Sequence, residues 1–246
     1  MSSPYFSIII PTHRAEAVIA ACLVSIARQT FKDFEIIVMD GKSDDKTVEI
    51  VSNHLARFNG RLTVHSEKDD GIYDVMNKGI QRAKGNWLYF IGADDCLHDS
   101  SVLETVAAFI RRQPDSDVVY GDVIMKSDAS RYAGAFDLER LLLEGNLCHQ
   151  AIFYRRTVFE KIGAYNLRYR VWADWDLNIR CFQHPDFKNR YLDLVVADYN
   201  NVDGFSSRQS DHELRKILPL WVRNGTSIRY LLRLKAANLF RKITGN

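Results

Sequence analysis

The sequence has few cysteines and no long apolar run. Its four cysteines are dispersed, without a C-x-x-C pair, which excludes a cysteine-based zinc site and a disulfide framework. No stretch approaches the roughly 20 apolar residues of a membrane-spanning helix, and the N-terminus lacks the basic segment of a signal peptide. We therefore expect a cytoplasmic protein with reduced thiols, soluble or attached peripherally to the inner face of the cell membrane.

A net charge of one sign is also absent. The 246 residues include 33 Lys and Arg and 31 Asp and Glu, a formal net charge of +2, which argues against a dedicated nucleic-acid binder. Nor is there a Walker A loop, a G-x-G-x-x-G fingerprint, an H-E-x-x-H helix or a G-x-S-x-G elbow. Any phosphate group would then be bound by a metal and cationic side chains. The composition, 46% hydrophobic and 26% charged, is that of a globular protein.

What the sequence does contain is an alternation of apolar, β-branched runs with amphipathic segments. The runs predict buried strands at Phe6–Ile10, Phe34–Met39, Leu62–His65, Trp87–Ile91 and Val118–Met125. The amphipathic segments predict helices at Ala15–Arg28, Asp45–Phe58, Ile72–Ala83 and Ser100–Arg112. After residue 133 shorter elements are expected, at Asp137–Glu144, Ala151–Tyr154, Thr157–Ile162, Asp174–Cys181 and Tyr191–Val196. The order predicts βαβ units and a mostly parallel sheet flanked by helices, the α/β class.

The C-terminal segment differs in its charge. Leu214–Asn246 contains eight Lys and Arg and no Asp or Glu, interleaved with leucines. We therefore divide the chain into a main domain, residues 1–212, and a basic amphipathic helical tail, residues 213–246. Such a composition is typical of a helix on an anionic lipid surface. Packing of the tail on the domain, or on a second subunit, is the alternative.

Acidic side chains gather where the predicted strands end. Asp40 follows the second strand, Asp69 the third, and Asp94 and Asp95 the fourth. Ligands of open parallel sheets bind at the carboxyl ends of the strands, and carboxylates crowded there repel one another unless a cation binds. A divalent metal, Mn²⁺ or Mg²⁺, together with a polyphosphate ligand meets this requirement.

Each of these residues also has a purely structural interpretation. Asp94 and Asp95 could turn the chain and cap the next helix, although two adjacent acids after an apolar strand favour a metal. Asp40 could bind a base or ribose, or form an Asx-turn or an N-cap in its Asp-Gly-x-Ser loop. Asp69 could belong to a solvated turn, and Lys78 to an exposed basic helix face.

Taken in order, these residues resemble the family 2 glycosyltransferases, which have the nucleotide-sugar-binding GT-A fold. The resemblance covers roughly residues 5–205 and rests on a succession of motifs: Ser7–Thr12, Ser25–Phe31, Asp40–Thr47, Gly71–Gly79 and Gly92–Asp95. The Gly71–Gly79 segment resembles the corresponding segment in the branch of the family that builds bacterial exopolysaccharides and surface glycans. The resemblance implies an inverting transferase that moves a sugar from a nucleotide-sugar, most often UDP-linked, to a hydroxyl of a glycan or polyprenyl-linked acceptor.

The resemblance also implies roles for residues along the donor. The nucleoside would contact Pro11, Thr12 and Asp40, and the rest of the donor would lie along Asp69 and Lys78. Asp95 would be the direct metal ligand of the family's D-x-D motif, with Asp94 reaching the ribose or the sugar. His149 and Gln150 would line the donor-sugar pocket. His149 could also be a third metal ligand. The diphosphate would be neutralised by Arg208, in a segment similar to the family's closing loop.

The general base implied by the resemblance is Asp174, which matches the second acid of the family's Glu-Asp pair. The first position here is Ala173, a departure that leaves Asp176 as the alternative base. Positions two apart on a helix do not share a face, so only one of the two acids is expected in the pocket. Asp174 could instead be an acid at a helix N-terminus, favoured by the helix dipole.

Three other functions remain open at this point: a metal-dependent nucleotide-sugar-binding protein without transferase activity, a nucleotidyltransferase, and a signalling receiver domain. A receiver domain has about half this length and would leave the elements after residue 133 unexplained. A nucleotidyltransferase would be expected to carry a glycine- and arginine-rich loop near its start, which this sequence lacks.

Overall fold

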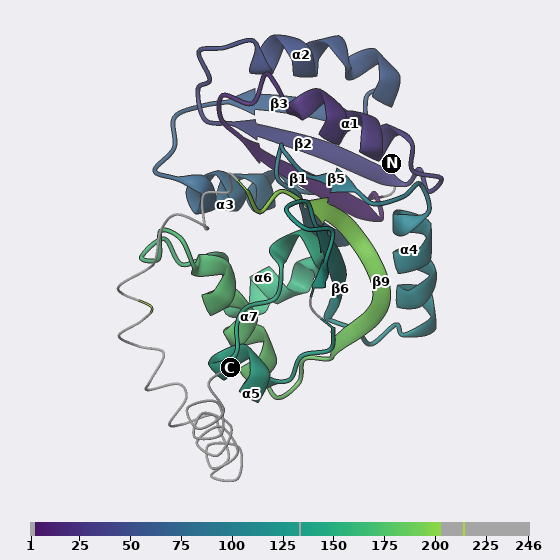
Figure 1. The fold of residues 1–246 in the computed structure, drawn as a ribbon, viewed down its shortest axis with the longest axis vertical. Helices are drawn as coiled ribbons and strands as arrows, with labels where there is room; N and C mark the ends of the chain where they lie inside the picture. Colours follow the sequence, from purple (N-terminus) through teal and green to yellow (C-terminus); the bar gives the residue numbers. More distant parts are fainter. Residues whose placement is uncertain (1–2, 133, 203–213, 215–246) are drawn as a thin grey trace.

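The computed structural model describes residues 3–132, 134–202 and 214. A mixed sheet forms the centre of the molecule, with its strands in the order β3-β2-β1-β4-β8-β6-β9-β5, and β7 pairs with β6 (Figure 1). The strands are β1 (Phe6–Thr12), β2 (Phe34–Asp40), β3 (Leu62–Ser66), β4 (Trp87–Phe90), β5 (Cys96–Leu97), β6 (Val118–Met125), β7 (Arg131–Tyr132), β8 (Ile152–Arg155) and β9 (Asn189–Tyr199).

The two halves of the sheet differ in strand direction. In the first half, β1 pairs in parallel with β2 and β4, and β2 pairs in parallel with β3. In the second half, β8 is antiparallel to β4 and β6, whereas β9 is parallel to β6. The short strands β5 and β7 are each antiparallel to their partners, β9 and β6. The predicted α/β class is confirmed.

Helices cover both faces of the sheet. One face is covered by α1 (Ile19–Ala27), α2 (Thr47–Asn53), the 3₁₀ turn η1 (Leu55–Phe58) and α4 (Val102–Arg112). The other face is covered by α3 (Ile72–Arg82), α5 (Leu138–Leu143), α6 (Arg156–Ile162) and α7 (Ala173–Gln183). A further 3₁₀ turn, η2 (His149–Ala151), directly precedes β8.

The apolar run of β1 explains this layering. Because side chains alternate across a strand, Ile8 and Ile10 pack into the core under α1, while Ile9 packs into the core under α3. All three are fully buried. A strand that is apolar on both faces is therefore stable only in the middle of a three-layer structure.

Several predicted boundaries were wrong. The helix predicted at 15–28 begins at Ile19, because the N–H groups of Ala15 and Glu16 bind the side chains of Thr47 and Asp45 in a preceding turn. The helix predicted at 45–58 divides at His54, where bonds to the third preceding residue replace the α-helical ones. Strands β5 and β7 were missed, because two residues carry no periodicity.

In the part of the chain that the structure describes, no helix has the length and apolar character to cross a membrane. Two predictions fall on residues outside the described ranges: Arg208, and the helical tail at 213–246 apart from Leu214. Leu214 itself is fully buried and packs in the core under α3 and α7.

Candidate active site

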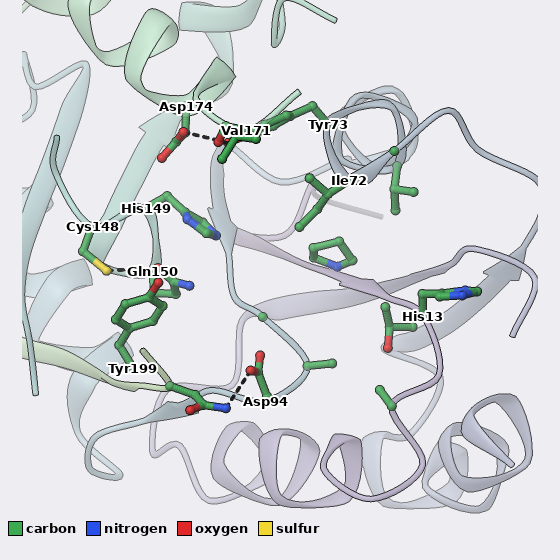
Figure 2. A pocket seen from close by; sticks show the side chains of 18 of the residues that line it. His13, Ile72, Tyr73, Asp94, Cys148, His149, Gln150, Val171, Asp174 and Tyr199 are labelled. Carbon is green, nitrogen blue, oxygen red and sulfur yellow. Dashed lines mark hydrogen bonds between the residues drawn. The ribbon is translucent and has the colours of Figure 1, made fainter. Parts of the chain in front are cut away.

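A cavity of about 1180 Å³ opens at the carboxyl ends of the parallel strands. One side of its wall comes from the loops after β1, β2, β3 and β4 and from the start of α3. The other side includes residues 146–150, 171, 172, 174, 175, 199 and 200. Figure 2 shows Asp174 near the top of the view and Asp94 in its lower half, with His149 at a level between them. The wall includes these predicted residues: Pro11, Thr12, Asp69, Asp94, His149, Gln150 and Asp174.

Thr12 is the last residue of β1, and its side chain ends at the cavity. The residue is 6% exposed, and its Oγ1 has no hydrogen-bond partner among the described residues. A buried hydroxyl without a partner costs free energy. A ligand atom that reached this oxygen would supply the missing hydrogen bond.

Asp40 ends β2 but does not line the cavity. Its Oδ1 accepts a hydrogen bond from Ser43 Oγ at 2.5 Å, and its Oδ2 accepts one from Ser66 Oγ at 2.6 Å. The Ser43 backbone N–H also donates to Oδ2. The backbone bond spans three residues, one more than in an Asx-turn, but it keeps the carboxylate engaged within its own loop, as a structural role requires. A contact between Asp40 and a nucleoside stays a prediction.

Asp69 and Lys78 differ in their access to the cavity. Asp69 is in the wall, where its Oδ1 accepts the Gly71 N–H at 2.8 Å. Its Oδ2 approaches Gly41 so closely that a Cβ there would collide with it unless the Asp69 side chain moved. Lys78 is outside the wall, pairs with Asp74 at 2.9 Å, and donates to the Lys68 carbonyl at 2.6 Å. Its contact with a donor stays a prediction.

The adjacent acids after β4 face different surroundings. Asp94 is in the cavity wall, and its Oδ2 accepts a hydrogen bond from Asn200 Nδ2 at 2.9 Å. Asp95 is 1% exposed and lies behind the wall, where Gln150 Nε2 and the Asn200 N–H donate to it at 2.9 and 2.7 Å. Burial, and then the charge of Asp94, raise the pKa of Asp95 to about 6. Metal ligation by Asp95 stays a prediction.

These acids fit a divalent cation. No group of three or more acidic, His or Cys side chains positioned for a metal occurs within residues 3–132 and 134–202. However, Mg²⁺ is usually held by one or two carboxylates plus substrate phosphates. Asp94 provides hard oxygen ligands at the cavity. The negative charge of Asp94 contributes to the raised pKa of Asp95, and a cation beside the two acids would relieve this repulsion.

His149 and Gln150 belong to the η2 turn and both line the cavity. Burial lowers the pKa of His149, with the charges of Asp174 and Asp94 acting in the opposite direction. Gln150 is 4% exposed and acts mainly through Asp95, because its Nε2 donates to that carboxylate while its Oε1 accepts the Cys148 thiol at 3.0 Å.

Asp174 lies in the first turn of α7, and it is the buried carboxylate of the cavity wall. Tyr73 Oη donates to its Oδ1 at 2.7 Å, and Asn146 Nδ2 donates to its Oδ2 at 2.7 Å. Burial raises the pKa of Asp174, whereas His149 and then the Tyr73 hydrogen bond act to lower it. A carboxylate with a raised pKa, facing a cavity, has the properties of a general base.

Asp176 points away from the cavity. It is 3% exposed and pairs with Arg180, one helical turn later, at 2.8 Å. Burial raises the pKa of Asp176, and Arg180 opposes that shift. Of the two candidate bases, Asp174 therefore has access to a ligand in the cavity. Trp172 and Trp175 also line the cavity, with their rings in edge contact at 5.6 Å.

Sequence reasoning missed the residues that hold the acids in place. Tyr73 and Asn146 donate to the carboxylate of Asp174. Asn200 donates to the carboxylate of Asp94, and Lys126 Nζ donates to the Asp94 backbone carbonyl. Tyr73 lies inside the Gly71–Gly79 motif, so its position offered a signal. The other three lie in segments without a recognisable motif, and they reach the acids only through tertiary structure.

The fold and the site define a class. A parallel half-sheet, acids after its fourth strand and a buried carboxylate across the cavity form the arrangement predicted for a GT-A glycosyltransferase. The sequence model described as glycosyl transferase family 2 matches residues 7–163. The chain belongs to this family, and it is a glycosyltransferase.

The relatives agree with this assignment. The chain is 53% identical to a PGL/p-HBAD biosynthesis glycosyltransferase of Mycobacterium tuberculosis over 225 residues, which cover 92% of this chain and 88% of the relative. It is similar in fold to TarS of S. aureus (TM-score 0.72, 20% identity) over 92% of this chain, but it spans only 41% of TarS.

A second solved structure is the mannosyltransferase PcManGT from Pyrobaculum calidifontis in complex with GDP-Man and Mn²⁺. It matches with a TM-score of 0.65 and 14% identity over 98% of this chain and 81% of its own. The GT-A fold predicted from the sequence is confirmed by these similarities.

Proposed function

We propose that the chain transfers a sugar from a nucleoside-diphosphate sugar to an acceptor hydroxyl, with inversion at the anomeric carbon. The observation that carries the proposal is the cavity itself. Asp94 at the strand ends and the buried Asp174 share one cavity wall. One carboxylate is suited to the charged donor, and the other to removing a proton from the acceptor.

The nucleotide would bind at the ends of β1, β2 and β3. Thr12 would donate its unpartnered hydroxyl to the nucleotide, beside Pro11 and Asp69 in the same wall. TarS is similar in fold and has been solved with UDP-GlcNAc, which supports a UDP-linked donor. Asp40 would shape this end through its bonds to Ser43 and Ser66, and His149 would face the donor sugar.

Asp94 and Asp95 would hold Mn²⁺ or Mg²⁺ at the donor diphosphate. PcManGT, of the same fold, was solved with Mn²⁺ and a nucleotide-sugar. When bound, such an ion offsets the negative charge that develops on a diphosphate leaving group. Asp94 would bring its carboxylate to the cavity, while Asp95, through Gln150 and Asn200, would keep that loop in place.

Asp174 would act as the general base. It accepts the proton of the acceptor hydroxyl as the hydroxyl oxygen attacks the sugar on the face opposite the diphosphate. A single displacement of this kind needs one base and no carboxylate nucleophile, and it inverts the configuration. The pairing of Asp176 with Arg180, outside the cavity, supports Asp174 over Asp176 in this role.

The acceptor would be a glycan or a lipid-linked glycan of the cell surface. The similarity to a PGL/p-HBAD biosynthesis glycosyltransferase supports a surface-glycan role in general terms. Residues 213–246 would bring the enzyme to an anionic membrane surface through their eight basic side chains.

The test is a panel of UDP- and GDP-sugars, measured by calorimetry and by nucleotide release, with and without Mn²⁺. We expect one donor to bind with Mn²⁺ and to release its nucleoside diphosphate when acceptor glycosides are added. Binding without turnover would favour a non-catalytic module, and release of pyrophosphate would favour a nucleotidyltransferase. Absence of binding by every nucleotide-sugar would overturn the proposal.

A further inference from the structure

Two neutral side chains from separate segments hold the carboxylate of Asp174. Tyr73, on α3, donates to Oδ1, and Asn146, in the loop before η2, donates to Oδ2, both at 2.7 Å. Asp174 itself is 9% exposed. Each oxygen thus has one donor, and neither donor carries a charge. Such an arrangement fixes the direction of the carboxylate without an ion pair that would weaken it as a base.

The Tyr73 hydroxyl has a second acceptor within reach. Its Oη lies 2.5 Å from the carbonyl oxygen of Val171, in the segment that leads into α7, as well as 2.7 Å from Asp174 Oδ1 (Figure 2). A tyrosine hydroxyl carries one proton, and burial keeps that proton in place by raising the pKa of Tyr73 well above its usual value. The ionised carboxylate is the stronger of the two acceptors.

This geometry lets Tyr73 serve both protonation states of Asp174. While Asp174 is ionised, Tyr73 donates to it. Once Asp174 holds a proton on Oδ1, that O–H can donate to Tyr73 Oη, and the Tyr73 O–H can turn to the Val171 carbonyl. No heavy atom needs to move between the two states, which is what preorganised groups offer during a proton transfer.

Asn146 can only donate to Asp174, because a hydrogen bond to its oxygen fixes the orientation of its amide. Asn178 Nδ2 donates to Asn146 Oδ1 at 2.8 Å, and Tyr154 Oη donates to Asn178 Oδ1 at 2.6 Å. The Asn146 oxygen therefore faces Asn178, and its NH₂ group faces Asp174. Asn178 is one helical turn after Asp174, so both lie on the same face of α7.

We propose that Tyr73 and Asn146 are positioning residues that orient Asp174 and keep it ionised for its work as the base. This inference rests on the role proposed above for Asp174. In the reaction the acceptor O–H bond breaks and its proton moves to Asp174. The acceptor oxygen bonds to the sugar C1, and the bond from C1 to the diphosphate breaks. Tyr73 and Asn146 keep their own protons throughout.

The first test compares two Tyr→Phe variants. Tyr73→Phe removes the donor to Oδ1, whereas Tyr165→Phe removes a buried hydroxyl that has no partner among the described residues, from a ring packed against Tyr73 at 5.3 Å. We expect Tyr73→Phe to lower kcat by about 10- to 100-fold, the range of a hydrogen bond to a charged group. Tyr165→Phe should keep kcat within about 3-fold of the unmodified enzyme.

The second test is the pH dependence of Tyr73→Phe and Asn146→Ala. Each variant removes a donor that favours the ionised form of Asp174, so the pKa of the base should rise. Because the base works only when ionised, the acid limb of kcat should then move to higher pH, by about one pH unit. The Kd of UDP with Mn²⁺, measured by calorimetry, should change little in either variant, and Tyr165→Phe should keep the original acid limb.

The outcomes separate this inference from the proposed function. If Asp174→Asn retains turnover, the base assignment fails, and the proposal for Tyr73 and Asn146 fails with it. If Asp174→Asn is inactive but Tyr73→Phe matches Tyr165→Phe in kcat and in pH profile, only the positioning role is overturned. If Tyr73→Phe does not fold, Asn146→Ala decides the question alone, and an unshifted acid limb would overturn the proposal.

Discussion

The two halves of the sheet position their site residues in different ways. On the side of β3, β2, β1 and β4, the wall residues lie directly at or just after the strand ends, so the backbone alone brings Thr12 and Asp94 to the cavity. On the other side, Asp174 is oriented by Tyr73 and Asn146, which are 101 and 28 residues away in the chain. We call the first side the donor half and the second the base half. The strand ends place the residues of the donor half, whereas hydrogen bonds from distant parts of the chain orient Asp174 in the base half.

The halves also differ in how their charges are compensated. In the donor half Asp40 is bound by nearby serines, and Lys78 pairs with an acid four residues earlier. In the base half Asp174 has two neutral donors, and burial is the largest influence on its raised pKa. We therefore expect substitutions in the base half to act on proton transfer, and those in the donor half to act on binding.

The sharpest test of this comparison is Asp174→Asn. The amide has the size of the carboxylate but cannot accept the proton, so kcat should fall by roughly 10²- to 10⁴-fold, the range of general-base catalysis. UDP binding with Mn²⁺ should remain measurable by calorimetry. Retained turnover would remove Asp174 as the base.

Asp176→Asn is the matched control, two residues along the same helix. Asp176 faces Arg180 and not the cavity, so kcat of the folded variant should stay within about 5-fold. Its melting temperature should fall, because the partly buried Arg180 loses a charged partner, a loss of about 2 kcal/mol. A variant with normal stability and no turnover would instead make Asp176 the base.

A smaller effect is expected from Asp94→Asn, which tests the donor half. Asp94 faces the cavity, so its loss should remove most of the gain in UDP affinity that Mn²⁺ provides, about 10- to 100-fold, with little change in melting temperature. The measurement is calorimetric titration of UDP with and without Mn²⁺. An unchanged gain would exclude Asp94 from the metal site.

Asp95→Asn sharpens the same test. If Asp95 ligates the metal, as the family resemblance implies, this variant should also lose the Mn²⁺ gain. Because Asp95 accepts bonds from Gln150 and Asn200, it should in addition melt at a lower temperature than Asp94→Asn. A variant of Asp95 that melts early but keeps the Mn²⁺ gain would leave Asp94 as the carboxylate that holds the ion.

The strand ends of the donor half could be predicted from the sequence because their signals are local, although Asp40, Lys78 and Asp95 lie outside the cavity wall. An apolar run followed by Pro-Thr or Asp-Asp marks both a buried strand and the polar residues at its carboxyl end, and parallel pairing brings such ends together. Asp174 was predicted from the resemblance, but its partners were not. No pattern in the chain links Tyr73 to Asp174 across 101 residues.

Two ion pairs of the structure have a signal in the sequence. Asp74 precedes Lys78 by four residues, and Asp176 precedes Arg180 by four, the spacing at which helical side chains form ion pairs. Both pairs are present in the structure. This spacing alone would have favoured a position of Lys78 outside the cavity, and it would have favoured Asp174 over Asp176 as the candidate base. Which oxygens of Asp40 and Asp95 are occupied could not be predicted, because Ser66, Gln150 and Asn200 meet them only after folding.

The smallest effect in this comparison is expected from Thr12→Val. The valine has nearly the shape of threonine and removes a buried hydroxyl that has no partner among the described residues, so the melting temperature of the free protein should not fall. UDP affinity should fall by about 2- to 10-fold, the value of one neutral hydrogen bond. The control is Thr47→Val, because Thr47 is outside the cavity wall, and its Oγ1 donates to Asp45 and accepts from the Ala15 N–H. That variant should melt earlier and keep its UDP affinity. Equal effects of the two substitutions on UDP binding would show that Thr12 does not contact the nucleotide. The donor half would then lose the residue that distinguishes binding at a strand end from a purely structural role.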